Sequence, residues 1–241
     1  MPTLKSRLAR SPALSLLAAR TYARLAALRA LVWRIALWPR ASVGWTVKVI
    51  GWRNIALGRN VVIGARSWLN VNQRSRGIAL TIGDNTYIGI ENFFSTGRSI
   101  RIGEYGLTGP RCAFIGSSHV YSDPAAHYAG TGTTDDAAID VGVNCFIGFG
   151  ATIQGNVRVG HGSVIGAHSV VRTDIPPFSV AVGNPARVVR HHDFASGRWI
   201  EGERAAGAPF PDEADYLAAL RMRTGFPIQP ISAAAATFGD I

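Results

Sequence analysis

Apolar side chains recur at every sixth position between residues 141 and 176. The repeated positions all carry β-branched residues: Val141, Ile147, Ile153, Val159, Ile165 and Val171. Glycine directly follows four of them, and a small side chain comes four places after each of the first five. Neither the 3.6-residue period of a helix nor the alternation of a simple strand produces a period of six. The pattern is typical of a parallel β-helix, in which each hexad forms one flat side of a triangular coil.

The same repeat is present upstream, with interruptions. Its apolar positions there are Leu57, Ile63, Leu69, Ile82, Ile88, Phe94, Ile102, Thr108 and Phe114. The period breaks between Asn72 and Ile78 and slips by two residues before Ile102. We therefore predict a single all-β solenoid domain over residues 41–190.

The longest interruption covers residues 117–136, which are rich in Gly, Ser, Asp, Tyr and His. The repeat returns directly afterwards, at Val141. Long loops inside compact domains are usually functional or disordered, and functional residues concentrate on loops that a rigid scaffold positions. We therefore expect the active site to include this loop.

The solenoid is flanked by two extensions. Residues 1–40 hold eight Lys and Arg and no Asp or Glu, so they carry +8 of the net charge of +10. Arginines at four- or five-residue spacing among apolar residues predict a basic amphipathic helix, either lying on an anionic membrane surface or covering the open end of the solenoid. Residues 191–241 form a C-terminal extension with a helix predicted over 211–223, where acids begin the segment and arginines end it.

Charge and cysteine usage exclude several classes of protein. No uncharged run in the N-terminal segment reaches about 18 residues, which argues against a transmembrane helix, and its arginines argue against a signal peptide. The basic charge lies on an apolar-faced helix rather than among base-stacking aromatics, which argues against nucleic-acid binding. Cys112 and Cys145 occupy small-residue positions of the repeat and are expected to be core thiols in a reducing compartment.

Two segments resemble a known family. Residues 146–190, which end in the run Gly183-Asn-Pro-Ala-Arg187, are similar to the C-terminal half of the hexapeptide-repeat acyltransferases. Residues 116–124, Gly-Ser-Ser-His-Val-Tyr-Ser-Asp-Pro, resemble the histidine loop of the sugar O-acetyltransferases in that family. The resemblance implies a left-handed parallel β-helix and a cytoplasmic homotrimer. It further implies direct transfer of an acetyl group from acetyl-CoA to a sugar hydroxyl, without a metal.

The resemblance assigns the general base to His119. Imidazole suits this role, and a positioned base contributes on the order of 10²–10⁴-fold to the rate. Asp123 is a candidate for fixing the tautomer of that imidazole. The family carries an asparagine one coil earlier, where this chain has Gly89. We therefore expect a different acceptor pocket, with the candidates Glu91, Asn92, Tyr121 and His127.

The donor site is also implied by the resemblance. Backbone N–H groups of Gly148, Phe149 and Gly150 match the positions that stabilise the oxyanion, and Ala167 matches the groove that holds the pantetheine arm. The phosphates of coenzyme A require basic side chains, and arginines suited to this role lie on the final coils. They are Arg172, Arg187 and Arg190.

Three other functions are open to a chain with this repeat. Acetyl transfer to an amine would use the same base. A non-catalytic scaffold would leave the loop histidine without a role. A zinc carbonic anhydrase of the same solenoid needs three histidine ligands, including a pair four residues apart, and neither His161 with His168 nor any partner of His119 has this spacing.

Overall fold

The computed structural model describes residues 40–75, 77–202 and 207–223, together with isolated residues between 21 and 36. The chain divides into two compact units, Met1–Trp38 and Pro39–Ile241. In the first unit the described residues are helical, and most of them are exposed. Most of the predicted basic helix lies outside the described residues, so its role stays a prediction. In the part of the chain that is described, no helix is both long and apolar enough to cross a membrane.

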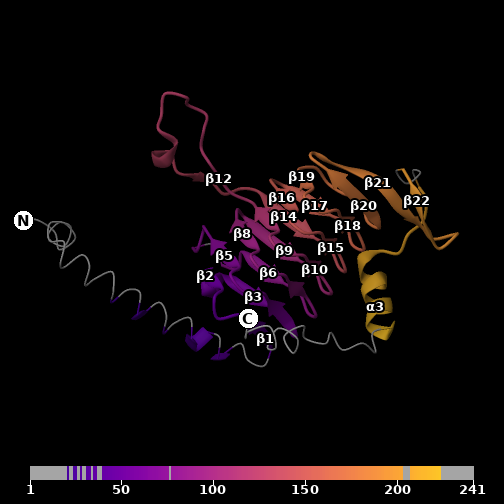
Figure 1. The fold of residues 1–241 in the computed structure, drawn as a ribbon, viewed down its shortest axis with the longest axis horizontal. Coiled ribbons are helices and arrows are strands. Elements are labelled where there is room, and N and C mark those ends of the chain that lie inside the picture. The colour runs from indigo at the N-terminus through magenta and orange to yellow at the C-terminus, as the bar shows by residue number, and fades with distance from the viewer. Residues whose placement is uncertain are drawn as a thin grey trace, which may run out of the picture. The chain divides into compact units, whose positions relative to one another are not determined.

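The second unit is built from three sheets of parallel strands that follow one another around each coil (Figure 1). Sheet A contains, in spatial order, β1 (Ala41–Val43), β4 (Val61–Ile63), β7 (Tyr87–Ile88), β10 (Leu107–Thr108), β15 (Phe146–Ile147), β18 (Val164–Ile165), β20 (Ser179–Gly183), β21 (Ala186–Asp193) and β22 (Arg198–Glu201). Sheet B contains β2 (Lys48–Ile50), β5 (Trp68–Val71), β8 (Phe93–Thr96), β11 (Ala113–Ile115), β16 (Thr152–Gln154) and β19 (Val170–Val171). Sheet C contains β3 (Ile55–Leu57), β6 (Leu80–Ile82), β9 (Ser99–Ile102), β14 (Ala138–Val141) and β17 (Val157–Val159). This is the predicted left-handed parallel β-helix.

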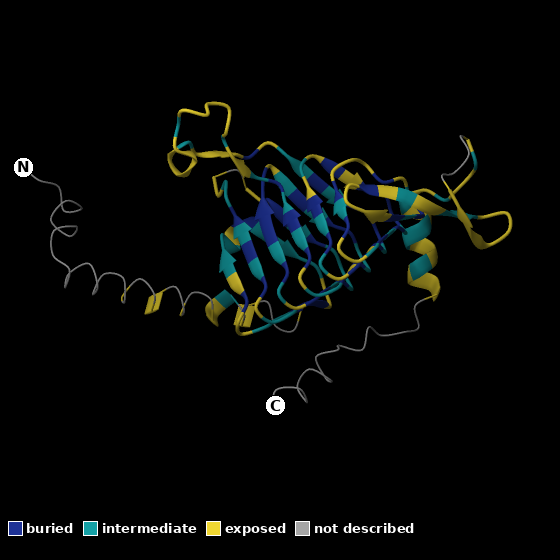
Figure 2. Cartoon of the chain, turned by 45° about the horizontal axis from the view of Figure 1, so that its top comes forward, coloured by how far each residue is buried: buried dark blue, intermediate teal, exposed yellow. Residues whose placement is uncertain are grey.

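The repeated apolar positions stack on one another from coil to coil. In sheet A the register pairs Ile63 with Ile88, then Thr108, Ile147 and Ile165. These side chains are buried, and the core they form runs through the inside of the solenoid (Figure 2). In sheet B the rings of Phe94 and Phe114 stack 4.6 Å apart on neighbouring coils. The hexad is thus the distance along the chain from one inward position to the next.

The last coil ends the parallel stacking. β20 turns back into β21 as an antiparallel pair, and β21 pairs in the same way with β22. The Gly183–Arg187 run forms the turn between β20 and β21, with Gly183 at φ 103° and a cis bond between Asn184 and Pro185. The run Gly183–Arg187 therefore marks the end of the parallel coils.

Shorter elements interrupt or follow the coils. Two 3₁₀ turns, η1 (Trp52–Asn54) and η2 (Tyr128–Gly130), lie in connections, and a two-stranded antiparallel hairpin, β12 (Ser118–His119) with β13 (Thr133–Thr134), lies within the long loop. Helix α3 (Glu213–Arg223) falls within the range predicted for a helix.

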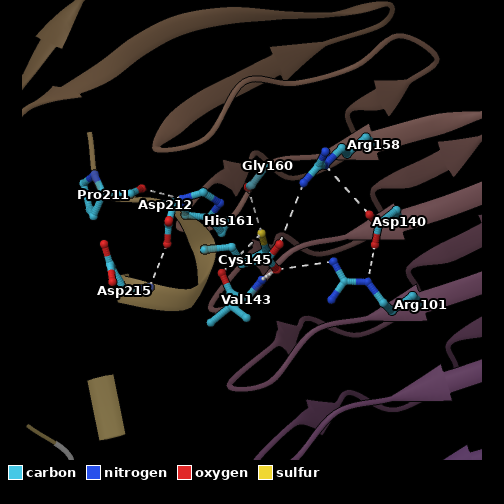
Figure 3. A network of polar contacts seen from close by, with 11 residues as sticks. Arg101, Asp140, Val143, Cys145, Arg158, Gly160, His161, Pro211, Asp212 and Asp215 are labelled. Atoms are coloured by element: carbon cyan, nitrogen blue, oxygen red, sulfur yellow. Dashed lines mark hydrogen bonds and ion pairs between the residues drawn. The ribbon is translucent and has the colours of Figure 1, made fainter. Parts of the chain in front are cut away.

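Helix α3 is fastened to successive coils (Figure 3). Before the helix, Pro211 O accepts a hydrogen bond of 3.0 Å from Nε2 of the buried His161. The Glu213 carboxylate accepts a bond of 2.9 Å from Val143 N and pairs with Arg101 at 3.3 Å. Farther along, Arg221 binds Glu104 at 2.8 Å. His161 is thus buried beneath the C-terminal extension.

Replacing Glu213 tests this attachment. Burial of Glu213 opposes its ionisation, but the hydrogen bond from Val143 N and the charge of Arg101 outweigh burial, so its pKa is lowered. The lowered pKa means that the carboxylate stabilises the fold above the ordinary glutamate pKa and loses this contribution as the pH falls through the folded-state value. We expect Glu213→Gln to reduce the free energy of unfolding by about 1–2 kcal/mol at pH 7. The difference from wild type should shrink towards pH 3 in urea titrations.

The matched control for this measurement is Glu201→Gln. Glu201 is exposed and lies 3.8 Å from Arg190, so its replacement should change stability little at either pH. Equal effects of the two substitutions would contradict a specific role for Glu213.

Candidate active site

The long loop places His119 on a hairpin that projects from the solenoid. The chain leaves the coil after β11, runs through β12, returns through β13 and re-enters at β14 (Figure 1). In the hairpin His119 lies opposite Thr133, and Ser118 lies opposite Thr134. The His119 side chain is exposed, and its ring has no hydrogen bond or ion pair to any residue that the structure describes. Its imidazole is therefore accessible to a reactant.

The other loop candidates make no side-chain hydrogen bond or ion pair with His119 in the described chain. Asp123 accepts a hydrogen bond of 2.9 Å from Ala125 N, so its carboxylate shapes a local turn instead. Tyr121 is 73% exposed and His127 is also exposed, so both side chains are open to solvent. The structure thus gives Asp123 a structural contact, while Tyr121 and His127 remain candidates for contacting an acceptor.

Glu91 and Asn92 lie at the opposite end of sheet B from the hairpin. They precede β8, whereas the hairpin follows the far end of the neighbouring strand β11. The amide of Asn92 is buried and donates to Gly89 O and Gly109 O, each at 2.9 Å. Asn92 therefore serves the turn and is not available to an acceptor.

Glu91 is held in a row of charges along the corner between sheets A and B. It binds Arg111 at 2.7 Å and Arg66 at 2.8 Å. Hydrogen bonds from Arg111 and Arg66 hold the pKa of Glu91 below its ordinary value. The carboxylate thus links three coils, and this ionic role accounts for the residue without an acceptor.

Of the three predicted oxyanion donors, one N–H remains available. Gly148 N donates to Ile165 O at 2.8 Å, and Gly150 N donates to Pro110 O at 2.9 Å. The N–H of Phe149 donates to no acceptor among the described residues. The ring of Phe149 is exposed and lies edge-on to His168 at 5.1 Å. The backbone at Phe149 is therefore the best placed of the three to bind a developing negative charge.

The predicted groove lies one coil farther on. Ala167 is exposed, and its coil packs so closely on the preceding one that a Cβ added to Gly148 would lie 2.7 Å from Ala167 N. Gly148 therefore has to be glycine for the coils to stack, whatever part its backbone takes in binding.

The three predicted phosphate ligands do not form one cluster. Arg187 lines a pocket of about 580 Å³ together with Thr173, and Arg172 is the exposed residue before Thr173. Arg190 lines a separate pocket of about 590 Å³ and lies 3.8 Å from Glu201. Arg172 and Arg187 are thus near one cavity, while Arg190 faces another.

The first pocket has a wall that the repeat does not predict. Residues Gly207–Phe210 of the C-terminal extension complete it. No period or motif in residues 191–210 indicates this contact. Separately, no group of three or more His, Cys, Asp or Glu in the described residues is arranged to hold a metal ion.

Both cysteines are buried inside the coils and unpaired with each other. Burial raises the pKa of the Cys112 thiol to about 11 and that of the Cys145 thiol to about 12. A nucleophilic cysteine requires an accessible thiolate. Neither thiol is therefore suited to carrying an acyl group.

No family model matches the chain. It is 38% identical over 112 residues to a Staphylococcus aureus protein named "Putative acetyltransferase SAR2635", a match that covers 46% of this chain and 55% of the relative. It is 29% identical over 141 residues to a Mycobacterium tuberculosis protein named "Probable acetyltransferase Rv3034c", covering 58% and 45% of the two chains. The chain thus spans about half the length of these curated relatives.

A solved structure shares the fold. The Bacillus cereus N-acyltransferase AntD, in complex with dTDP and 3-hydroxybutyryl-CoA, superposes with a TM-score of 0.55 at 19% identity. The match covers 64% of this chain and 80% of the AntD chain.

Alkylation tests the exclusion of a thiol nucleophile. We expect iodoacetamide at pH 8 to modify Cys112 and Cys145 slowly in the native protein and rapidly in denaturant, because burial suppresses the thiolate. Mass spectrometry of both peptides measures the two rates. Rapid labelling of Cys112 in the native state, with loss of acyl-CoA turnover, would contradict this assignment.

Proposed function

We propose that this chain is an acyl-CoA-dependent acetyltransferase of the hexapeptide-repeat type, and that its acceptor is a hydroxyl of a sugar or glycan precursor. The observation that carries the proposal is the exposed imidazole of His119, which makes no hydrogen bond to the described residues, on a hairpin beside the solenoid. The acetyltransferase names of its sequence relatives support the same reaction class.

In this mechanism His119 removes the proton from the acceptor hydroxyl as its oxygen attacks the thioester carbonyl of acetyl-CoA. The C–O bond forms, and the negative charge on the carbonyl oxygen is stabilised by the N–H of Phe149. The intermediate then expels the thiolate of coenzyme A, which takes up the proton from the imidazolium. No covalent acyl-enzyme is needed, consistent with the burial of both thiols.

We place the phosphates of the donor at the pocket lined by Arg187 and Thr173, with Arg172 beside it. Arginine suits this role because its planar fork matches phosphate oxygens. The pantetheine arm would then run past Ala167 towards Phe149, along coils whose strands are about 4.8 Å apart.

The active site is proposed to lie between copies of the chain in a homotrimer. Phe149 precedes β16 and His119 follows the neighbouring strand β11, so within one protomer they lie at opposite ends of sheet B. A strand of three residues spans roughly 10 Å, too far for both groups to reach one carbonyl. The hairpin of one copy would therefore meet the Phe149 corner of another.

The outer face of sheet A supports such an assembly. A column of apolar residues crosses it in register, with Leu107 40% exposed and Phe146 43% exposed. Tyr87 and Val164 continue the column on the neighbouring strands. A contiguous exposed apolar face of this kind is typical of a protein–protein contact.

The alternative acceptor is the amine of an amino sugar, because the same base would serve. The two are separated by the product: an acetyl ester is cleaved by hydroxylamine, whereas an amide is not. We favour the hydroxyl because residues 116–124 resemble the histidine loop of the sugar O-acetyltransferases.

A thiol-release assay tests the proposed function. We expect acetyl-CoA with a panel of sugars and amino sugars to give acceptor-dependent release of coenzyme A, and His119→Ala to lower kcat by about 10²–10⁴-fold. The control is His191→Ala, a histidine in β21 that is remote from the hairpin, which should leave kcat unchanged. Acceptor-dependent release that survives in His119→Ala would remove His119 as the base.

The assembly is tested by replacing Phe146 with Lys. A lysine in the apolar column would have to be desolvated at the contact, so Phe146→Lys should shift the mass measured by light scattering from trimer towards monomer. Thr81→Lys, on the outer face of sheet C, is the matched control and should leave the mass unchanged. A monomeric wild-type protein at micromolar concentration would contradict the assembly.

A further inference from the structure

The break in the repeat at Asn72 lies next to the hairpin in space, although 45 residues separate Asn72 from Ser117. β5 pairs with β8, and β8 pairs with β11, so the end of β5 lies two coils away from the point where the hairpin begins (Figure 1). Two adjacent side chains at this break, Asn72 and Gln73, reach across the intervening coil. Asn72 contacts the segment that leads into β12, at Ser117, and Gln73 contacts the segment that follows β13, at Asp135. We call these segments the outgoing leg and the returning leg of the hairpin.

Asn72 holds the outgoing leg. Its Nδ2 lies 2.5 Å from Ser117 Oγ and 2.9 Å from Thr96 O. Ser117 also shares a hydrogen bond of 3.1 Å with the buried hydroxyl of Ser95. Ser117 precedes β12 directly, so this contact fixes the backbone one residue before the strand that carries His119.

Gln73 holds the returning leg. Its Nε2 donates to Asp135 Oδ2 at 2.6 Å, and the same oxygen accepts a bond of 3.1 Å from Thr133 Oγ1. Asp135 is only 5% exposed, whereas the loop residues 118–134 are exposed or half-buried. Thr133 is the residue opposite His119 in the hairpin. Gln73 is therefore connected to the backbone of His119 through Asp135 and Thr133.

The close stacking of the coils makes this reach possible. Gly97, on the coil between, lies so near the start of the loop that an added Cβ would be 2.1 Å from Gly116 O. There is accordingly no side chain at Gly97 to separate the Asn72–Gln73 pair from the hairpin. The irregular segment after β5 thus lets Asn72 and Gln73 contact the hairpin, which a regular hexad would not do.

We propose that Asn72 and Gln73 are positioning residues that clamp both legs of the hairpin and thereby set the location of His119. The inference rests on the proposed function, because it assigns them a catalytic effect through that base. The His119 ring makes no hydrogen bond or ion pair to the described residues, so its position is set by the backbone of the hairpin rather than by a polar contact of its own. A displacement of about 1 Å in a reacting group can cost up to 10²-fold in rate.

The test compares Gln73→Leu with wild type in two measurements. In hydrogen exchange, the amides of the hairpin should exchange roughly fivefold faster or more in the variant, while those of β11 and β14 stay protected. In the thiol-release assay kcat should fall about tenfold or more, with KM for acetyl-CoA within about twofold, because donor binding does not involve the clamp.

Three further variants separate positioning from a general loss of structure. Gln154→Leu is the matched control, since Gln154 is an exposed glutamine on β16 whose side chain makes no hydrogen bond to the described residues. Asp135→Asn keeps an acceptor oxygen for Gln73 and should retain most of kcat, whereas Asp135→Leu should behave like Gln73→Leu. In the His119→Ala background, Gln73→Leu should lower the residual rate no further.

Unchanged exchange of the hairpin amides in Gln73→Leu would overturn the clamp. Faster exchange with an unchanged kcat would overturn its catalytic effect. Full activity of His119→Ala would instead overturn the proposed base, and the exchange measurement would still report the clamp separately.

Discussion

The parallel stacking of coils in register is the constraint on which the other features depend. Each strand pairs with the same strand of the coils before and after it, so an inward position on one coil requires inward positions above and below. A one-residue slip in any strand would turn its apolar side chain to the outer face. Substitutions and insertions are therefore tolerated best at the corners, on the outer faces and where the chain leaves the coil. The hairpin, the charged corner at Glu91 and the attachment of α3 all lie at such places.

A rigid solenoid determines what a loop on it can do. The chain enters the hairpin from β11 and leaves it into β14, and each of these strands is hydrogen-bonded to a strand on both sides. The two ends of the hairpin are therefore held in fixed positions. The loop beyond carries polar, exposed residues and contributes little to the core. The core residues and the loop that carries the proposed base are thus separate parts of the chain, so substitutions in the loop cost the scaffold little stability.

The repeat was readable from the sequence because it is set by local spacing. Ile147 and Ile165 predict both the fold and the register, and the gap at residues 117–136 predicts where the loop leaves.

What spacing does not reveal are contacts made across coils. The pairing of Gln73 with Asp135 joins residues 62 apart, and the sequence shows only an irregular stretch at the first of them. Arg187 and Arg190 line different pockets, one completed by Gly207–Phe210 and the other by Glu201 and Gly202, and no repeat in the sequence indicates either contact. Asn92 is a candidate in the sequence because it lies near the position where the family carries an asparagine, whereas the structure shows that its amide is buried and hydrogen-bonded within the coil.

Helix α3 changes how the solenoid can come apart. In a stack whose units contact only their nearest neighbours, terminal units can detach one at a time, and the free energy of unfolding is close to a sum over units. Here the extension is bound at His161, at Val143 and at Glu104, which lie on three successive coils. Loss of the last coils therefore requires release of contacts deeper in the stack. Fraying at this end becomes a joint event of several coils, and the C-terminal half of the solenoid should melt as one cooperative unit rather than coil by coil.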